Sequence, residues 1–239
     1  MKRLTPHIFA ALTCGLGFAS IANAECRQAL ALGLDVSGSV DAREYRLQLD
    51  GLATALSSPS VQTAILAQPQ NPMMILVYEW SGPNDQSIIH PWTTLETATD
   101  LENLTQVLRN TRRQSTSPGT ALGQAMLKGA AYLDQIDCWT KTLDISGDGE
   151  SNLGPRPRDV KPILIPSNIT INALVIGADD PVIGDTRQVE ISRLSAYFQA
   201  EVIIGSDAFV ETSLGFSQYA AAMTRKLERE IKVLQLSSR

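Results

Sequence analysis

The sequence predicts an α/β fold: a three-layer, doubly wound and mostly parallel sheet with helices on both faces and one antiparallel edge strand. Short apolar runs typical of buried strands alternate along the chain with segments whose apolar residues recur every three or four positions, as in amphipathic helices. Such alternation favours parallel strand pairing with helices on both sides of the sheet. Neither a linker nor a shift in composition divides residues 25–239, so we expect one domain.

The expected elements follow one another in a regular order. Strands are expected at residues 28–34, 73–80, 142–146, 169–176 and 201–204. An antiparallel hairpin partner at 87–92 follows a turn-forming segment at 81–85. Helices are expected at 45–56, 101–108, 122–133, 191–198 and 216–234, with a short helix within the proline-rich residues 155–166.

The composition is that of an ordinary globular protein with an acidic charge balance. Of the 239 residues, 44% are hydrophobic, and 25 Asp and Glu outnumber 20 Lys and Arg. This balance argues against a basic nucleic-acid-binding surface. Beyond the N-terminus no apolar run reaches the roughly 20 residues of a transmembrane helix, so we expect no such segment.

The N-terminus has the pattern of a secretory signal peptide. Residues 1–3 form a short basic region, residues 8–21 are apolar or small, and residues 22–24 form an Ala-Asn-Ala cleavage triplet. We therefore predict that residues 1–24 are a signal peptide and that the mature protein is exported, either to the periplasm or out of the cell. The alternatives are a buried N-terminal helix or a lipoprotein anchored at Cys14, whose preceding residues fit a lipobox poorly.

Two cysteines remain after removal of the signal peptide. An even pair in an exported protein indicates a disulfide between Cys26 and Cys138. The spacing supports the pairing, because each cysteine precedes a carboxylate, Asp35 or Asp148, by nine or ten residues. If these carboxylates end adjacent parallel strands, the cysteines lie at similar heights at the opposite end. The alternative is two separate thiols, since the sequence does not show that the Cα atoms are close enough.

The first strand ends abruptly in three polar side chains, Asp35, Ser37 and Ser39. In an open α/β sheet, ligands bind in the crevice beyond the carboxyl ends of the strands. All three side chains offer hard oxygen ligands, which suit Mg²⁺, Mn²⁺ or Ca²⁺ and not zinc. The alternative is a simple strand-to-helix turn in which Asp and Ser cap the next helix.

Two further polar residues occupy matching places later in the chain. Thr120 lies in the polar loop that opens a helix, and Asp148 follows the strand at 142–146 as part of an Asp-Gly pair. An Asp-x-Ser-x-Ser motif, a distant Thr and an Asp-Gly in this order resemble the metal-ion-dependent adhesion site of von Willebrand factor type A domains. The resemblance covers residues 28–234. More narrowly, the Ile-Ser-Gly-Asp-Gly run at 145–149 and the Ala-Phe-Val at 208–210 are similar to a bacterial family of exported proteins of unknown function.

The resemblance implies a role for each site residue. Ser37, Ser39 and Thr120 would bind Mg²⁺, or Mn²⁺ or Ca²⁺, through their hydroxyls, and Asp35 and Asp148 would act directly or through water. Two carboxylates leave such an ion incompletely neutralised, with an outer position open to an Asp or Glu carboxylate of a protein partner.

The expected function is therefore an exported, metal-dependent protein-binding module for adhesion or scaffolding. The alternative is a structural domain whose metal site is vacant or purely stabilising.

The sequence departs from the family pattern at Gly147, where the family usually has threonine. This glycine predicts a less constrained Asp148 loop.

Two other interpretations concern residues near these motifs. Asp144, Ser146 and Asp148 have the spacing of an EF-hand calcium loop, but Pro155 stands where that loop needs Glu. We favour instead a structural role for Asp144, hydrogen-bonded to neighbouring loops. Trp80, Trp92 and His90 flank the turn at 81–85 and either line a recognition surface or pack at the sheet edge.

Catalysis is the remaining alternative. A Ser nucleophile normally needs a His base, and the only histidines are His7, in the signal peptide, and His90. The sequence contains neither a Gly-x-Ser-x-Gly elbow nor a glycine-rich phosphate loop. A metal-assisted hydrolase normally brings more carboxylates to its metal, so we expect a protein that is not an enzyme.

Overall fold

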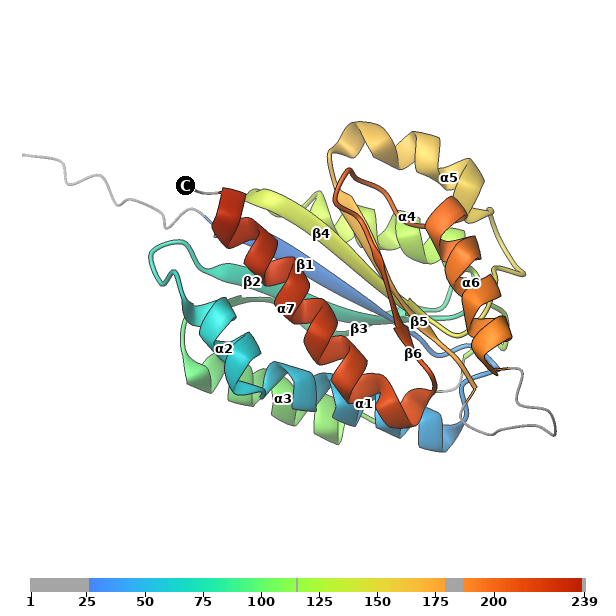
Figure 1. The fold of residues 1–239 in the computed structure, drawn as a ribbon, viewed down its shortest axis with the longest axis horizontal. Coiled ribbons are helices and arrows are strands. Elements are labelled where there is room, and N and C mark those ends of the chain that lie inside the picture. The colour runs from blue at the N-terminus through green and yellow to red at the C-terminus, as the bar shows by residue number, and fades with distance from the viewer. Residues whose placement is uncertain (1–25, 115, 179–186, 238–239) are drawn as a thin grey trace, which may run out of the picture.

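A six-stranded sheet lies between two layers of helices in the computed structural model, which describes residues 26–114, 116–178 and 187–237 (Figure 1). The strand order is β3-β2-β1-β4-β5-β6, and every neighbouring pair is parallel except β2 and β3. The predicted fold class and the antiparallel edge strand are therefore confirmed. The predicted signal peptide lies outside the described residues.

The elements alternate along the chain as the apolar periodicity indicates. The strands are β1 (Cys26–Asp35), β2 (Met73–Trp80), β3 (Gln86–Leu95), β4 (Cys138–Gly147), β5 (Thr170–Ile176) and β6 (Val210–Ser213). The α-helices are α1 (Ala42–Leu56), α2 (Pro59–Leu66), α3 (Ala98–Asn110), α4 (Leu122–Leu133), α5 (Pro157–Leu164), α6 (Arg187–Glu201) and α7 (Tyr219–Ser237). Among the described residues, no helix is long and apolar enough to cross a membrane.

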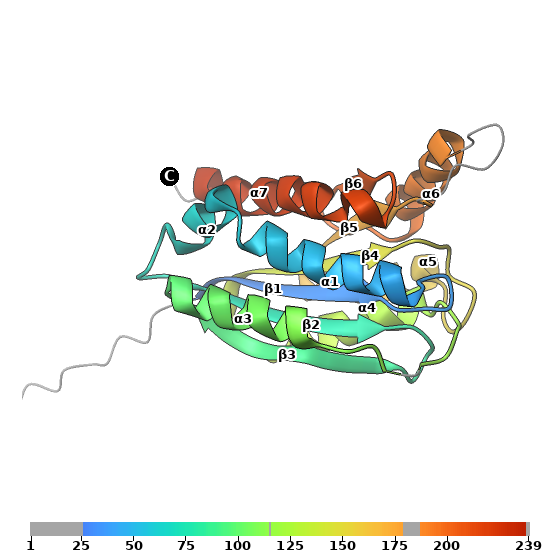
Figure 2. The same ribbon diagram turned by 90° about the horizontal axis from the view of Figure 1, so that it is seen from below.

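Alternate residues of β1 face the two helical layers. Leu30, Leu32 and Leu34 pack in a core with α1, α2, α3 and α7, whereas Ala29 and Ala31 pack in a second core with α4, α5 and α6. Figure 2 shows α1, α2 and α7 on the same side of β1. Because both faces are covered, all ten residues of β1 are buried, as is usual for a central parallel strand.

One expectation about the elements is wrong, and two elements, β6 and α2, were not expected. Residues 201–204 do not form a strand of the sheet: Glu201 ends α6, and only Ile204 makes an isolated antiparallel bridge, to Ile171. The sixth strand is β6, whose sequence Val-Glu-Thr-Ser lacks an apolar run because it is a short edge strand. A further helix, α2, begins directly after α1. Pro59 stands at its first position, where the backbone N–H would have no partner within the helix, so proline breaks no hydrogen bond there.

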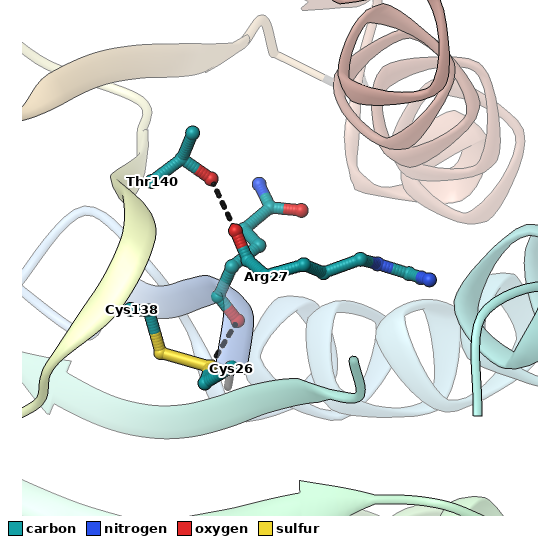
Figure 3. Close-up of a disulfide and its surroundings, with 5 residues drawn as sticks. Cys26, Arg27, Cys138 and Thr140 are labelled. Atoms are coloured by element: carbon teal, nitrogen blue, oxygen red, sulfur yellow. Dashed lines mark hydrogen bonds between the residues drawn. A yellow bond between two sulfur atoms is a disulfide. The ribbon is translucent and has the colours of Figure 1, made fainter. Parts of the chain in front are cut away.

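The predicted disulfide joins the first residues of the two central strands. Cys26 and Cys138 are direct partners in the β1–β4 ladder, with Cα atoms 4.6 Å apart (Figure 3). Two residues further along β4, the Thr140 hydroxyl donates a hydrogen bond of 3.0 Å to the Arg27 carbonyl. The disulfide therefore links the amino ends of β1 and β4, at the opposite end of the sheet from the loops that follow these strands.

Replacing both cysteines by serine should lower the free energy of unfolding by about 2–5 kcal/mol, because the bond restricts an unfolded chain over a separation of 112 residues. Urea unfolding of the oxidised wild type and the double variant measures the difference. Reduction of the wild type should cause the same loss and reduction of the variant none. Equal stability of the two oxidised proteins would contradict this role.

Candidate functional site

The predicted site residues lie on three loops at the carboxyl edge of the sheet. The parallel register pairs Leu34 of β1 with Ser146 of β4, so the residues that follow these strands lie side by side. Backbone hydrogen bonds tie the loops together: the Gly38 N–H donates to the Pro118 carbonyl at 2.9 Å, and the Asn152 N–H donates to the Thr120 carbonyl at 2.9 Å. The arrangement is the ligand-binding crevice expected for this class of sheet.

Four of the five predicted residues form a chain of hydrogen bonds. The Ser37 N–H donates to Asp35 Oδ1 at 2.8 Å, and the Ser37 and Ser39 hydroxyls lie 3.1 Å apart. The Ser39 hydroxyl then donates to Asp148 Oδ1 at 2.7 Å. Side chains 109 residues apart in the sequence are thus in direct contact.

Thr120 joins this group through the loop backbones. Its N–H donates to Asn152 Oδ1 at 2.8 Å, and the Asn152 N–H donates back to the Thr120 carbonyl. Asn152 therefore fixes the position of Thr120, whose side chain is buried. No motif in the sequence indicates this pairing of Asn152 with Thr120.

Among the described residues, the two carboxylates of the site have no cationic partner. Asp35 is fully buried, and its Oδ2 has no hydrogen-bond partner among the described residues. Burial, together with the charge of Asp148, raises the pKa of Asp35 to about 8, and burial also raises the pKa of Asp148. Within the described part of the chain, no Lys or Arg forms an ion pair with either carboxylate, and no three His, Cys, Asp or Glu side chains gather as a metal-binding cluster. The site is therefore rich in hydroxyls and short of positive charge.

Arg113 holds the Asp35–Ser39 loop from the side. Its guanidinium donates to the Val36 carbonyl at 3.0 Å and the Ser37 carbonyl at 3.1 Å, and it also contacts the Val40 carbonyl. Sequence reasoning missed this residue, because nothing local distinguishes Arg113 from its exposed neighbour Arg112.

Two glycines allow the close packing of these loops. A Cβ atom at Gly38 would lie 2.8 Å from the Cβ of Pro118, so a side chain there would push two loops apart. A Cβ at Gly147 would lie 3.2 Å from Phe198 and 3.4 Å from Asp35 Oδ2. The glycine that departs from the family pattern therefore leaves room beside the unpartnered oxygen of Asp35.

Asp144 belongs to a different part of the molecule. It lies inside β4 and forms a buried ion pair with Lys226 of α7. Both earlier interpretations, an EF-hand ligand and a side chain hydrogen-bonded to loops, are wrong, because the residue faces a helix on one side of the sheet.

The aromatic residues near the turn pack within the fold. Trp80 is completely buried and His90 is nearly so, which removes both from a recognition surface. Trp92 is half-buried, and its indole N–H donates to the Tyr132 carbonyl at 3.3 Å. The packing interpretation is therefore correct for these three residues.

Residues 25–235 match the family model described as "Protein of unknown function (DUF1194)". The chain belongs to the DUF1194 family. No curated protein matches it significantly.

Several solved structures are similar in fold to this DUF1194 chain, and one of them is described as von Willebrand factor type A. Proximal thread matrix protein 1 from the mussel byssus is 15% identical, with a TM-score of 0.58, over 87% of this chain and 48% of that one. The pilus adhesin SpaC from Lactobacillus rhamnosus GG is 16% identical, with a TM-score of 0.63, over 87% and 31%. A von Willebrand factor type A protein from Catenulispora acidiphila is 14% identical, with a TM-score of 0.56, over 86% and 43%. The chain thus spans about half or less of these proteins, and at such identities the likeness shows the fold alone.

The unbalanced charge of the site predicts a pH dependence for protein treated with a chelator. The pKa of Asp35 is about 8 in the folded state and about 3.9 in an unfolded chain, so folding takes up a proton between these values. Stability should therefore fall as the pH rises from about 4 to about 8, and Asp35→Asn should flatten this profile.

Urea unfolding across this pH range measures the effect. Asp137→Asn, an exposed position just before β4 at the opposite end of the sheet, is the matched control and should keep the wild-type profile. If the stability of the wild type and of Asp35→Asn changes with pH in the same way, the raised pKa of Asp35 is not the cause of the pH dependence.

Proposed function

We propose that this DUF1194 protein is an exported, divalent-metal-dependent protein-binding module that serves in adhesion or as a scaffold. Asp35, Ser37, Ser39, Thr120 and Asp148 would hold Mg²⁺, or Mn²⁺ or Ca²⁺. The ion would in turn capture an Asp or Glu carboxylate of a protein partner. Export follows from the predicted signal peptide at residues 1–24 and agrees with the disulfide at Cys26 and Cys138.

The Oδ2 atom of the buried Asp35 carboxylate, which has no hydrogen-bond partner among the described residues, carries this proposal. A buried carboxylate oxygen without a hydrogen bond is costly, and a second carboxylate nearby adds repulsion. A divalent cation between Asp35 and Asp148 would relieve both effects, and the Ser37 and Ser39 hydroxyls already lie between these two carboxylates. The residues present therefore fit a bound ion.

The comparisons support the same function. One structure of the mussel byssus protein, 16% identical over 87% of this chain with a TM-score of 0.59, is described as having a zinc-occupied MIDAS motif. For this chain we propose Mg²⁺, Mn²⁺ or Ca²⁺, because all five side chains offer oxygen and none offers the nitrogen or sulfur that zinc prefers. The adhesin among the similar structures agrees with binding to a protein.

The chain's own residues would prepare the site before the ion arrives. Arg113 fixes the carbonyls of the Asp35–Ser39 loop and Asn152 fixes Thr120, so little reorganisation accompanies binding. Ser39 is exposed, which leaves the site open to a carboxylate from outside. We assign no catalytic step, since His90 is buried on the edge strand β3.

Asp35→Ala should abolish saturable binding of Mg²⁺ or Mn²⁺, because it removes one of the two carboxylates that we propose hold the ion. Calorimetric titration of each ion into chelator-stripped protein measures it, with Asp137→Ala as the matched control that should bind as wild type does. Loss of binding with an unchanged melting temperature supports the proposal. No binding by the wild type, together with a lower melting temperature for Asp35→Ala, would favour a purely structural domain.

Arg113→Lys should weaken metal binding several-fold while the protein stays folded, since an ammonium cannot bridge three carbonyls as the planar guanidinium does. The same titration compares it with Arg112→Lys, the neighbouring exposed arginine. If both variants bind Mg²⁺ like the wild type, Arg113 does not position the site.

A further inference from the structure

A second group of charged side chains lies buried between the sheet and α7. Lys226 and Glu230 come from consecutive turns of α7, and Asp144 comes from the middle of β4. Their exposed fractions are 0% for Lys226, 1% for Asp144 and 5% for Glu230. The proposed function does not use these residues, so their chemistry requires a separate account.

The lysine contacts both carboxylates. Lys226 Nζ contacts Asp144 Oδ1 and donates a hydrogen bond of 2.8 Å to Glu230 Oε1. Neither Asp144 oxygen has a further hydrogen-bond partner among the described residues. The ring of Phe209 lies 5.2 Å from Nζ and helps to exclude water. An amine, a carboxyl group and a second carboxylate able to move a proton therefore meet in a dry site.

We propose that Lys226 and Asp144 become joined by an intramolecular isopeptide bond, with Glu230 accepting and returning the proton. Lys226 would be the nucleophile, Asp144 the electrophile and Glu230 the general base and acid. The reaction is a condensation and needs no oxidant, reductant or other reactant.

The atoms of this step balance. The Lys226 ammonium gives a proton to the Glu230 carboxylate, and the free amine attacks Cγ of protonated Asp144. A C–N bond forms, a C–O bond of Asp144 breaks, and the departing hydroxyl takes a proton from Glu230. The nitrogen then releases its extra proton to Glu230, so the products are one amide, one water and a neutral Glu230.

The charges of the group favour this reaction. Burial and the neighbouring Glu230 raise the pKa of Asp144 to about 7 despite Lys226, so its protonated, electrophilic form is accessible near neutral pH. Burial lowers the pKa of Lys226, but the two carboxylates outweigh burial and raise it, so the amine depends on Glu230 to remove its proton. A neutral amide also replaces a buried ion pair, whose desolvation is costly.

Asn172 is the other candidate electrophile, but its contacts point elsewhere. It lies beside Asp144 in the ladder, where its amide Nδ2 donates to Glu230 Oε1 at 2.6 Å and its Oδ1 accepts from the Phe209 N–H at 3.0 Å. Asn172 therefore orients Glu230. The two possibilities differ in the lost molecule: water with Asp144, ammonia with Asn172.

Mass spectrometry of the reduced and alkylated protein tests the proposal. We expect the wild type to be lighter by one water than its sequence requires, and Lys226→Arg to have its full mass. Trypsin should release a branched peptide that joins residues 142–158 to residues 226–229, with no cleavage after the modified lysine. This peptide also distinguishes the bond from water lost at the Asp148-Gly149 pair.

Several outcomes would overturn the proposal. Full mass of the wild type with separate, unmodified peptides would show that the group is only an ion pair. Loss of ammonia would assign the bond to Asn172. Glu230→Gln, which preserves the size of the side chain, should leave most of the chain uncondensed, and complete condensation in this variant would remove Glu230 from the reaction. The wild-type mass requires no variant to fold, so the central result stands independently.

Discussion

The structure depends above all on the parallel pairing of β1 with β4 at the centre of the sheet. Their register begins at Cys26 opposite Cys138 and continues to Leu34 opposite Ser146. One ladder therefore sets the distance between the two cysteines at one end and the two site carboxylates at the other. The chain leaves β1 toward β2 on one side and leaves β4 toward β5 on the other, so the loops after these two strands diverge and open a crevice between them. The disulfide and the candidate site thus lie at opposite ends of the same pair of strands, and the register of that pair positions both.

The loops at this crevice are fixed by polar contacts rather than by apolar packing. Arg113 donates to carbonyls of the Asp35–Ser39 loop, and Asn152 pairs with the backbone of Thr120. Neither Arg113 nor Asn152 bonds to the hydroxyls of Ser37 and Ser39, which contact each other and Asp148 instead. Such an arrangement keeps oxygen ligands in place at the cost of holding Asp35 and Asp148 close together, and this repulsion is what a cation would remove.

The residue pattern predicts most of this architecture, because apolar periodicity reports directly which residues face a core. The strands at β1, β2, β4 and β5 and the long helix α7 follow from it. It fails at β6, where a polar edge strand carries no apolar signal, and at 201–204, where a buried β-branched run only continues the core beyond α6. The five predicted site residues occupy one loop cluster, since motif and strand end coincide. Arg113 and the pairing of Asp144 with Lys226 could not be predicted, because each joins segments whose proximity only the folded chain creates.

Two pairs of carboxylates, Asp144 with Glu230 and Asp35 with Asp148, differ in their burial and in their access to positive charge. Asp144 and Glu230 share a lysine supplied by the chain itself and are closed off beneath α7, so no external cation is needed there. Asp35 and Asp148 have serine hydroxyls between them, no such lysine among the described residues, and the exposed Ser39 at their edge. Within the part of the chain that the structure describes, no cationic side chain balances the second pair. The sheet therefore places an internally balanced pair where α7 is held and an unbalanced pair beside the exposed Ser39, and the metal and partner that we propose belong to the unbalanced pair.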